Sequence, residues 1–201
     1  MSTLGTDFFA RSVHAVARDL LGCELRFGGV GGVIVETESY ERDDPACHAY
    51  AGLTPRTATL FGPPGHAYVY LSYGIHALLN AVAEPEGSAA AVLIRALEPR
   101  WSVERMRERR AALGWNGGEE LALRDLCSGP GKLTQALGIG LDQNGAPLTA
   151  PPFELRQRSP EWREMEVETG PRIGINRATE RPWRFCAAGS AYLSRPIVRA
   201  A

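Results

Sequence analysis

The spacing of apolar and polar positions predicts an amphipathic helix near the start of the chain. Within residues 6–21, the side chains of Phe9, Val13 and Leu20 fall close to one stripe, as on the buried face of a helix. Gly22 follows the last apolar position of this stripe and is expected to end the helix.

Two more helices are expected in the second half of the chain. Residues 102–113 are strongly charged and predict a surface helix, which the glycine-rich residues 114–118 interrupt. Residues 130–137 predict a short helix, because a proline stands in the first turn, Ser128 can cap the start and Gly138 follows the end.

Runs rich in β-branched and aromatic residues predict strands between these helices. Such runs occupy residues 23–27, 33–40, 67–72, 76–82, 89–97, 172–175 and 183–186. Glycines over residues 28–32 predict a loose hairpin turn, and Tyr73-Gly74 predicts the tip of a second hairpin. Polar or Gly/Pro-rich loops are expected over residues 41–64 and 142–152.

This order of elements predicts a mixed α/β fold. Hairpin connections favour a curved antiparallel β core with helices around it, in a single compact domain over residues 1–201. No run of about eighteen apolar residues occurs, so no membrane span is expected. The first nine residues lack the pattern of a signal peptide, so a cytoplasmic protein is expected.

Charge and cysteine content narrow the possible classes of protein. The net charge of -1 argues against a strongly basic DNA-coating protein but leaves room for a local basic face. Of 22 basic residues, 21 are arginines and Lys132 is the one lysine. The four cysteines are widely and irregularly spaced, so neither a disulfide framework nor a zinc site is expected.

Two carboxylates stand out in the strand predicted over residues 33–40. In a regular strand, Glu36, Glu38 and Tyr40 share one face with Ile34. Burying two carboxylates is costly, so the simple alternative is an edge strand with this face in water. Glu36 is interpreted as an ion-pair or hydrogen-bond partner rather than as a second catalytic group.

Aromatic residues gather in the hairpin over residues 67–82. Alternation places Tyr68 and Tyr70 on one face, while Tyr73 falls at the tip, where a large ring has little to pack against. Rings from two strands with a histidine nearby can clamp a planar base, and an exposed ring at a turn suits a wedge into a base stack. An accidental surface tyrosine is the alternative.

Several long motifs resemble one known family. They are VETESY at residues 35–40, DDPACHAY at 43–50, TPR at 54–56, FGPPGHAYVYLSYGIHALLN at 61–80, VLIRALEPR at 92–100 and LCSGPGKL at 126–133. Together with RIGI at residues 172–175, they are similar in order and spacing to the alkyladenine (3-methyladenine) DNA glycosylases. The resemblance runs from the first helix to Arg184-Phe185.

The resemblance implies roles for three groups in the chemistry. Glu38 corresponds to the general base that activates a water to attack the sugar carbon. Arg95 corresponds to the arginine that contacts the phosphate beside the flipped nucleotide and helps to hold that water. The backbone of Ile175 corresponds to a third partner of the water.

The resemblance also implies how the base is held. Tyr40 would stack on one face of the base, and His48 with Tyr70 on the other. Tyr73 would fill the space that the flipped nucleotide leaves. Asn80 would crowd the 2-amino group of ordinary guanine.

The function expected from these roles is monofunctional excision of damaged purines from double-stranded DNA, during base excision repair. The lesions would be 3-methyladenine, 7-methylguanine, hypoxanthine and ethenoadenine, and the product an abasic site. A monomer without cofactor or metal is expected, associated with the nucleoid through DNA. Lys132, at a helix start, is a candidate for a phosphate contact, whereas the arginines at 105, 107, 109 and 110 predict a solvated helix face.

Two other functions fit part of the pattern. A metal-dependent hydrolase could use Glu36, Glu38 and His48, although no further ligands stand at suitable spacing, and activity that survives a chelator would argue against it. A non-catalytic module could bind damaged bases without cutting. The presence of both Glu38 and Arg95 argues against such a module, because recognition alone needs no water-activating carboxylate.

Overall fold

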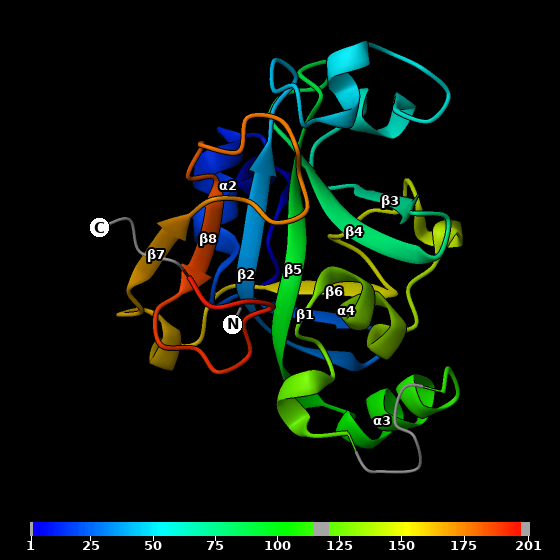
Figure 1. Ribbon diagram of the computed structural model, residues 1–201, viewed down its shortest axis with the longest axis vertical. Coiled ribbons are helices and arrows are strands. Elements are labelled where there is room, and N and C mark those ends of the chain that lie inside the picture. Colours follow the sequence, from blue (N-terminus) through cyan, green and yellow to red (C-terminus); the bar gives the residue numbers. More distant parts are fainter. Residues whose placement is uncertain (1, 115–120, 198–201) are drawn as a thin grey trace.

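An open antiparallel sheet forms the centre of the molecule in the computed structural model, which describes residues 2–114 and 121–197. Within these residues the sheet contains β1 (Glu24–Phe27), β2 (Val30–Tyr40), β3 (Ala67–Ser72), β4 (His76–Ala83), β5 (Ala90–Trp101), β6 (Phe153–Arg156), β7 (Val167–Gly170) and β8 (Arg184–Ala187). The main path runs β3-β4-β5-β2-β1-β6, while β8 pairs with both β2 and β7. The expected mixed α/β fold with an antiparallel core is therefore confirmed (Figure 1).

The two longest strands, β2 and β5, lie side by side through the middle of the sheet (Figure 1). Strand β2 has β5 along one edge; its other edge pairs first with β1 and then, from Glu36 to Glu38, with β8. Register shifts on either side of Glu36 break the regular alternation that the sequence predicts for this strand. Since β2 is paired on both edges and both carboxylates are fully buried, the edge-strand alternative is wrong.

The helix expected over residues 130–137 has these bounds in the structure, whereas those expected over 6–21 and 102–113 are shorter than predicted. Four α-helices occur among the described residues, α1 (Thr6–Phe9), α2 (Val13–Leu20), α3 (Val103–Ala111) and α4 (Pro130–Leu137). Single 3-10 turns add η1 (His48–Ala51), η2 (Ala58–Phe61), η3 (Leu123–Asp125), η4 (Leu141–Gln143) and η5 (Pro160–Trp162). The glycine-rich break expected after the third helix begins at Gly114, which has a φ of +75°, while residues 115–118 lie outside the described part.

The expected single helix over residues 6–21 is wrong, because the chain turns between α1 and α2. Ser12 adopts a φ of -46° and a ψ of 131°, outside the helical region. The backbone N–H of Val13 donates to the Glu84 carboxylate at 3.0 Å, so a side chain from the end of β4 caps α2. This partner is 71 residues away in sequence, and no local pattern could have indicated the break.

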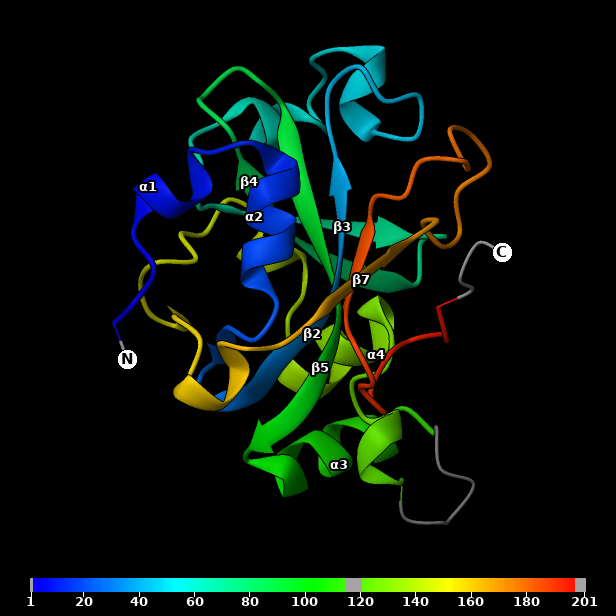
Figure 2. The same ribbon diagram turned by 90° about the vertical axis from the view of Figure 1, so that its left-hand side faces the viewer.

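The core lies between the sheet and the helices α2, α3 and α4. Val16 and Leu20 of α2 pack into the same buried cluster as Ile34 of β2 and Ile94 of β5. Figure 2 shows α2 running along this part of the sheet. The hydroxyl of Thr134 in α4 donates to the backbone of β4, so α4 is fixed beside the β3–β4 hairpin. The sheet thereby brings the hairpin, β2 and β5 to one region.

One further expectation is corrected, and two strands are additional to those expected. Residues 172–175 form no strand: Gly174 has a φ of +79°, and the neighbouring N–H of Ile173 donates to the Glu38 side chain instead of to a strand. Strands β6 and β7, of four residues each, were not expected.

The solvated face expected for the arginines of α3 is wrong for two of the four. Arg110 is buried, and Arg109 donates to the last carbonyls of α4, at Ala136 and Leu137. These carbonyls have no partner within their own helix and carry partial negative charge, which explains why a guanidinium binds there.

Among the described residues, no helix is both long enough and apolar enough to cross a membrane.

Candidate active site

A cavity of about 820 Å³ opens beside the β3–β4 hairpin. Its wall is built from the hairpin, the ends of β2 and β5, the start of α4 and the loops around residues 45–56 and 173–177. The wall includes all but one of the site residues predicted from sequence, namely Tyr40, His48, Tyr70, Tyr73, Asn80, Arg95, Lys132 and Ile175. The fold thus brings together residues that lie far apart in the sequence.

Glu38 is the exception, because it lies behind the wall rather than on it. Its side chain is fully buried. Its Oε1 accepts the backbone N–H of Ile173 at 2.7 Å, and its Oε2 accepts Arg95 Nη1 at 3.1 Å and the Tyr40 hydroxyl at 2.8 Å. All three donors belong to residues of the cavity wall, so one layer of side chains and backbone separates this carboxylate from the cavity.

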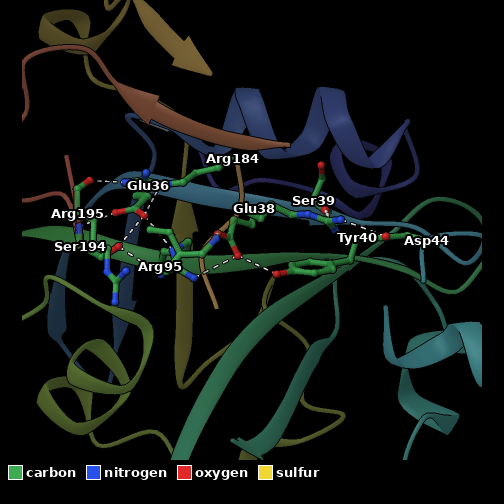
Figure 3. A network of polar contacts seen from close by, with 11 residues as sticks. Glu36, Glu38, Ser39, Tyr40, Asp44, Arg95, Arg184, Ser194 and Arg195 are labelled. Carbon is green, nitrogen blue, oxygen red and sulfur yellow. Dashed lines mark hydrogen bonds and ion pairs between the residues drawn. The ribbon is translucent and has the colours of Figure 1, made fainter. Parts of the chain in front are cut away.

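Arg95 joins the two carboxylates of β2 (Figure 3). Its Nε donates to Glu36 at 2.9 Å, while Nη1 donates to Glu38. Burial lowers the pKa of Arg95, but the charges of Glu38 and Glu36 outweigh this effect and the pKa is raised. The guanidinium therefore carries its charge at the cavity wall.

Glu36 does not line the cavity and is the centre of a second set of contacts (Figure 3). Besides Arg95, it accepts Arg184 Nε at 2.8 Å, and the Ser194 backbone N–H at 2.6 Å and hydroxyl at 2.7 Å. The expectation that Glu36 is an ion-pair and hydrogen-bond partner is met by these contacts. The two carboxylates of β2 therefore have different surroundings. Glu36 contacts the C-terminal segment, whereas Glu38 lies directly behind the cavity wall.

A buried ion pair between Arg172 and Asp44 packs against the ring of Tyr40. The Arg172 guanidinium lies 4.5 Å from the centre of the Tyr40 ring and is itself bonded by both Nη atoms to Asp44. Burial and then the Glu38 charge hold the pKa of Tyr40 well above its ordinary value, so its hydroxyl keeps the proton that it donates to Glu38. One ring therefore lines the cavity with a fixed orientation.

A second aromatic group lines the cavity from the loop and β3. His48 contacts Tyr70 with 4.4 Å between ring centres, and its Nδ1 is hydrogen-bonded to the Tyr68 hydroxyl at 2.9 Å. Burial and then the nearby Arg56 lower the pKa of His48 from its ordinary value of 6.5. Burial raises the pKa of Tyr70 to about 12. Both groups are therefore neutral near pH 7, and the cavity offers uncharged ring surfaces.

Asn80 and Lys132 occupy other parts of the wall. The Asn80 amide donates to the backbone of Tyr68 at 3.0 Å, which fixes the side chain next to the aromatic group. Lys132, in the first turn of α4, donates to the Ser128 hydroxyl at 3.4 Å.

The tip of the β3–β4 hairpin carries Tyr73, which is 90% exposed. Tyr73 has a φ of +51° and Gly74 a φ of +70°, as the tight turn requires. Ile75, beside them, is 73% exposed. Two large apolar side chains thus project from the rim of the cavity without a partner in the described structure.

Several residues of this site were not assigned roles from sequence. They are Asp44, Arg172, Ile173, Arg184 and Ser194. Asp44 and Arg172 are charged residues within the motifs DDPACHAY and RIGI, so the motifs could have indicated them as site residues. The backbone of Ile173 and the serine near the C-terminus gave none, because a backbone donor carries no sequence signature. Ile175, two residues after Ile173, was expected to be a partner of the water, and it lines the cavity.

The residues of the metal-hydrolase alternative do not form one group. Glu36 and Glu38 are bonded to Arg95, whereas His48 is bonded to Tyr68. Within residues 2–114 and 121–197, no three His, Cys, Asp or Glu side chains lie where they could hold a metal ion.

Fold and site together define an α/β protein that can enclose a planar ring beside a buried carboxylate. Comparison with known proteins gives the family. The methylpurine-DNA glycosylase (MPG) family matches residues 7–191, and the chain belongs to this family of DNA glycosylases, enzymes of base excision repair.

Similar proteins occur in several bacteria, each named "Putative 3-methyladenine DNA glycosylase". The protein of Rhodopseudomonas palustris strain CGA009 is 56% identical over 192 residues, which are 96% of this chain and 88% of that protein. The protein of Bradyrhizobium diazoefficiens is 53% identical, over 94% of this chain and 90% of that protein. The protein of Rhizobium meliloti strain 1021 is 50% identical, over 96% and 97%.

Proposed function

We propose that this chain excises alkylated or deaminated purines from double-stranded DNA and leaves an intact abasic strand. The lesions are those of the 3-methyladenine, 7-methylguanine, hypoxanthine and ethenoadenine class. The observation that carries the proposal is a buried carboxylate, Glu38, directly behind the wall of an aromatic cavity. In this mechanism Glu38 activates a water that attacks the sugar carbon and breaks the bond to the base.

The hydrogen bonds of Glu38 leave one acceptor position of its carboxylate for a water. An ionised carboxylate offers about four acceptor positions. Ile173, Arg95 and Tyr40 fill three of them, two on Oε2 and one on Oε1. A water on the remaining position of Oε1 would lie beside the 173–175 segment, where the backbone of Ile175 is proposed as a further partner. Because Glu38 has no exposed surface, DNA binding has to shift this segment or Tyr40 to admit the water.

The cavity wall suits the proposed bases. An alkylated purine carries positive charge, and the faces of Tyr40 and Tyr70 attract cations through the ring quadrupole. Stacking on such rings contributes about 1–3 kcal/mol per base for charged and neutral lesions alike. Tyr40 would stack on one face of the base and His48 with Tyr70 on the other, while Asn80 would exclude the 2-amino group of guanine.

DNA is proposed to bind across the rim of the cavity. Tyr73 at the hairpin tip would enter the stack where the flipped base was, and its 90% exposure supports that role. Arg95 would contact the phosphate beside the flipped nucleotide, and Lys132 at the start of α4 would contact another. Flipping costs a few kcal/mol, and least for a damaged or mispaired base, which adds selectivity.

The test is Glu38→Gln, measured in single-turnover base release from a hypoxanthine duplex. The amide keeps the shape of the side chain but cannot take a proton from water, so the rate should fall by about 10²–10⁴-fold while lesion binding persists. Glu41→Gln is the matched control, because the half-exposed Glu41 side chain pairs with His14 and Arg181 and, among the described residues, bonds to neither Glu38 nor Arg95. It should leave the rate unchanged.

Two results would contradict the proposal in different ways. A Glu38→Gln rate within about tenfold of the parent would remove Glu38 as the general base. Lesion binding by the parent chain without release of any free base, over a panel of single-lesion duplexes, would instead indicate a non-catalytic binding module.

A further inference from the structure

Glu36 has an arrangement that the proposed chemistry does not use. It is a fully buried carboxylate two residues before the proposed base, on the opposite side of Arg95 (Figure 3). Burying a charge in this way is expensive unless every lone pair is satisfied. Here four donors contact it: Arg95, Arg184 and the Ser194 hydroxyl at Oε1, and the Ser194 backbone N–H at Oε2.

The contacts of Glu36 reach the C-terminal segment. Arg184 also donates to the carbonyls of Arg195 and Pro196, and Arg95 Nη2 donates to the Ser194 hydroxyl at 3.3 Å. The segment around Ser194 is therefore tied to both arginines and, through them, to the two carboxylates of β2. Ser194 is 99 positions from Arg95 and 158 from Glu36 in the chain, so only the fold brings these three residues together.

Arg95 is held on two sides by these contacts. Glu36 binds its Nε and Glu38 binds its Nη1, which leaves the plane of the guanidinium little freedom to rotate. The charges also balance, because two arginines and two carboxylates share the buried cluster. Without the charge of Glu36, both guanidinium groups would act on Glu38 alone.

We propose that Glu36, held by Ser194 and Arg184, is a positioning residue that fixes Arg95 and shares its charge, so that Glu38 remains an effective base. This inference rests on the proposed role of Glu38. Glu36 itself touches neither DNA nor water in this scheme. Its effect passes through Arg95, and the C-terminal segment becomes part of the catalytic architecture.

The proposal predicts a shift in the pH dependence of base release. The charged and titratable groups around Glu38 are Arg95 from β5, Arg184 and Cys186 from β8, Glu36 and Tyr40 from its own strand, Tyr70 from β3 and Arg172 from the segment after β7. Glu36→Gln removes one negative charge from this set. The unbalanced guanidinium groups then favour the ionised carboxylate of Glu38 over the protonated one, so Glu38 becomes a weaker base.

The experiment is single-turnover base release from a hypoxanthine duplex between pH 5 and pH 8, with the full chain. For Glu36→Gln we expect a plateau rate at least about tenfold lower and an acid limb displaced to lower pH. Glu36→Asp keeps the charge but shortens the side chain, so the acid limb should return toward that of the parent while the plateau stays reduced. A merely structural Glu36 would change the folded fraction and leave the acid limb in place.

Ser194→Ala provides a milder variant in case Glu36→Gln fails to fold. It removes the hydroxyl from Glu36 and Arg95 but keeps the backbone donor, and the plateau should fall about three- to tenfold, a loss appropriate to one ordinary hydrogen bond. Ser190→Ala is the matched control in the same segment, because the Ser190 hydroxyl accepts the backbone N–H of Tyr192 and, among the described residues, makes no hydrogen bond to Glu36 or Arg95. It should match the parent.

The outcomes separate this inference from the proposed function. Folded Glu36→Gln with an unchanged acid limb, or Ser194→Ala equal to Ser190→Ala, would overturn the positioning role. Glu38→Gln belongs in the same series. Full activity there contradicts the proposed function, whereas a normal Glu36→Gln beside an inactive Glu38→Gln contradicts only the inference about Glu36.

Discussion

At the scale of single residues, we predict that the charge state of His48 affects which bases the cavity can accept. The imidazole lies against Tyr70 on the cavity wall, so a proton on its ring would repel a cationic base. Burial and Arg56 lower its pKa from 6.5, which keeps the ring neutral at pH 7. The lowered pKa therefore preserves an uncharged stacking surface in the range where a repair enzyme works.

We predict that acid weakens the binding of cationic lesions more than that of neutral ones. Because the pKa of His48 is lowered, the ring stays neutral through 6.5 and gains its proton only below that value. The ratio of affinities for 7-methylguanine and hypoxanthine duplexes should be constant from pH 8 to about 6.5 and fall at lower pH. Binding to the Glu38→Gln variant measures this ratio without turnover.

The matched control is His48→Asn in the same background, which has no group that titrates at this position. Its ratio should stay flat across the whole pH range. If the ratio of the parent background is flat as well, His48 does not determine the charge preference of the cavity.

At the scale of elements, the β3–β4 hairpin serves two purposes. Its strands give Tyr70 and Asn80 to the cavity wall, and its tip carries Tyr73 outside the body of the sheet. A hairpin can do both because side chains along its strands alternate between the two faces of the sheet, whereas residues of the turn do not follow this alternation. The proposed stacking surface and the proposed wedge are thus fixed relative to each other by one local structure.

We predict that Tyr73→Ala weakens base flipping more than the chemical step. Without the ring, the extruded state loses the group that keeps the stack open, so its population should fall. Release of hypoxanthine, a neutral and poor leaving group, should slow more than release of 7-methylguanine. Single-turnover rates on both duplexes are the measurement.

Tyr50→Ala is the control for Tyr73→Ala. Tyr50 is another exposed tyrosine, 55% accessible, and it does not line the cavity. It should leave both rates as they are. Equal and negligible effects of the two variants would mean that Tyr73 is a surface residue only.

At the scale of the whole molecule, the basic residues are almost all arginines, and this limits the chemistry available. A glycosylase that attacks the sugar with an amine needs a lysine or the N-terminal amine. Lys132 is the one lysine in 201 residues, and the fold places it on the cavity wall. An arginine cannot replace it, because a guanidinium stays protonated.

We predict that water and not Lys132 is the nucleophile, so the strand stays intact after base release. Incubation with lesion DNA and borohydride should give no covalent protein–DNA band on a denaturing gel. Lys132→Ala should keep its chemical step and lose at most the affinity due to one phosphate contact. A covalent band that disappears in Lys132→Ala would overturn the monofunctional mechanism while leaving base excision itself in place.

The sequence by itself determined most strands of the sheet, although not β6 and β7, and several side chains that line the cavity. Alternation over residues 67–82 is a local property, set by the two-residue repeat of a strand, so it can be read without the fold. The family motifs are also local, and they placed Tyr40, His48, Tyr70, Asn80 and Arg95 on the residues that the cavity wall contains.

Only the tertiary structure decided how the two carboxylates of β2 are used. Pairing of β2 on both edges buries Glu36 and Glu38, and the register shifts beside Glu36 alter the face pattern. The partners of Glu36 and Glu38 include Ser194 and the backbone of Ile173, 158 and 135 residues away. Such contacts depend on how distant strands and loops meet, and a backbone donor looks the same whatever its side chain. For that reason, the position of Glu38 behind the cavity wall and the link from Glu36 to the C-terminal segment could not be predicted from sequence.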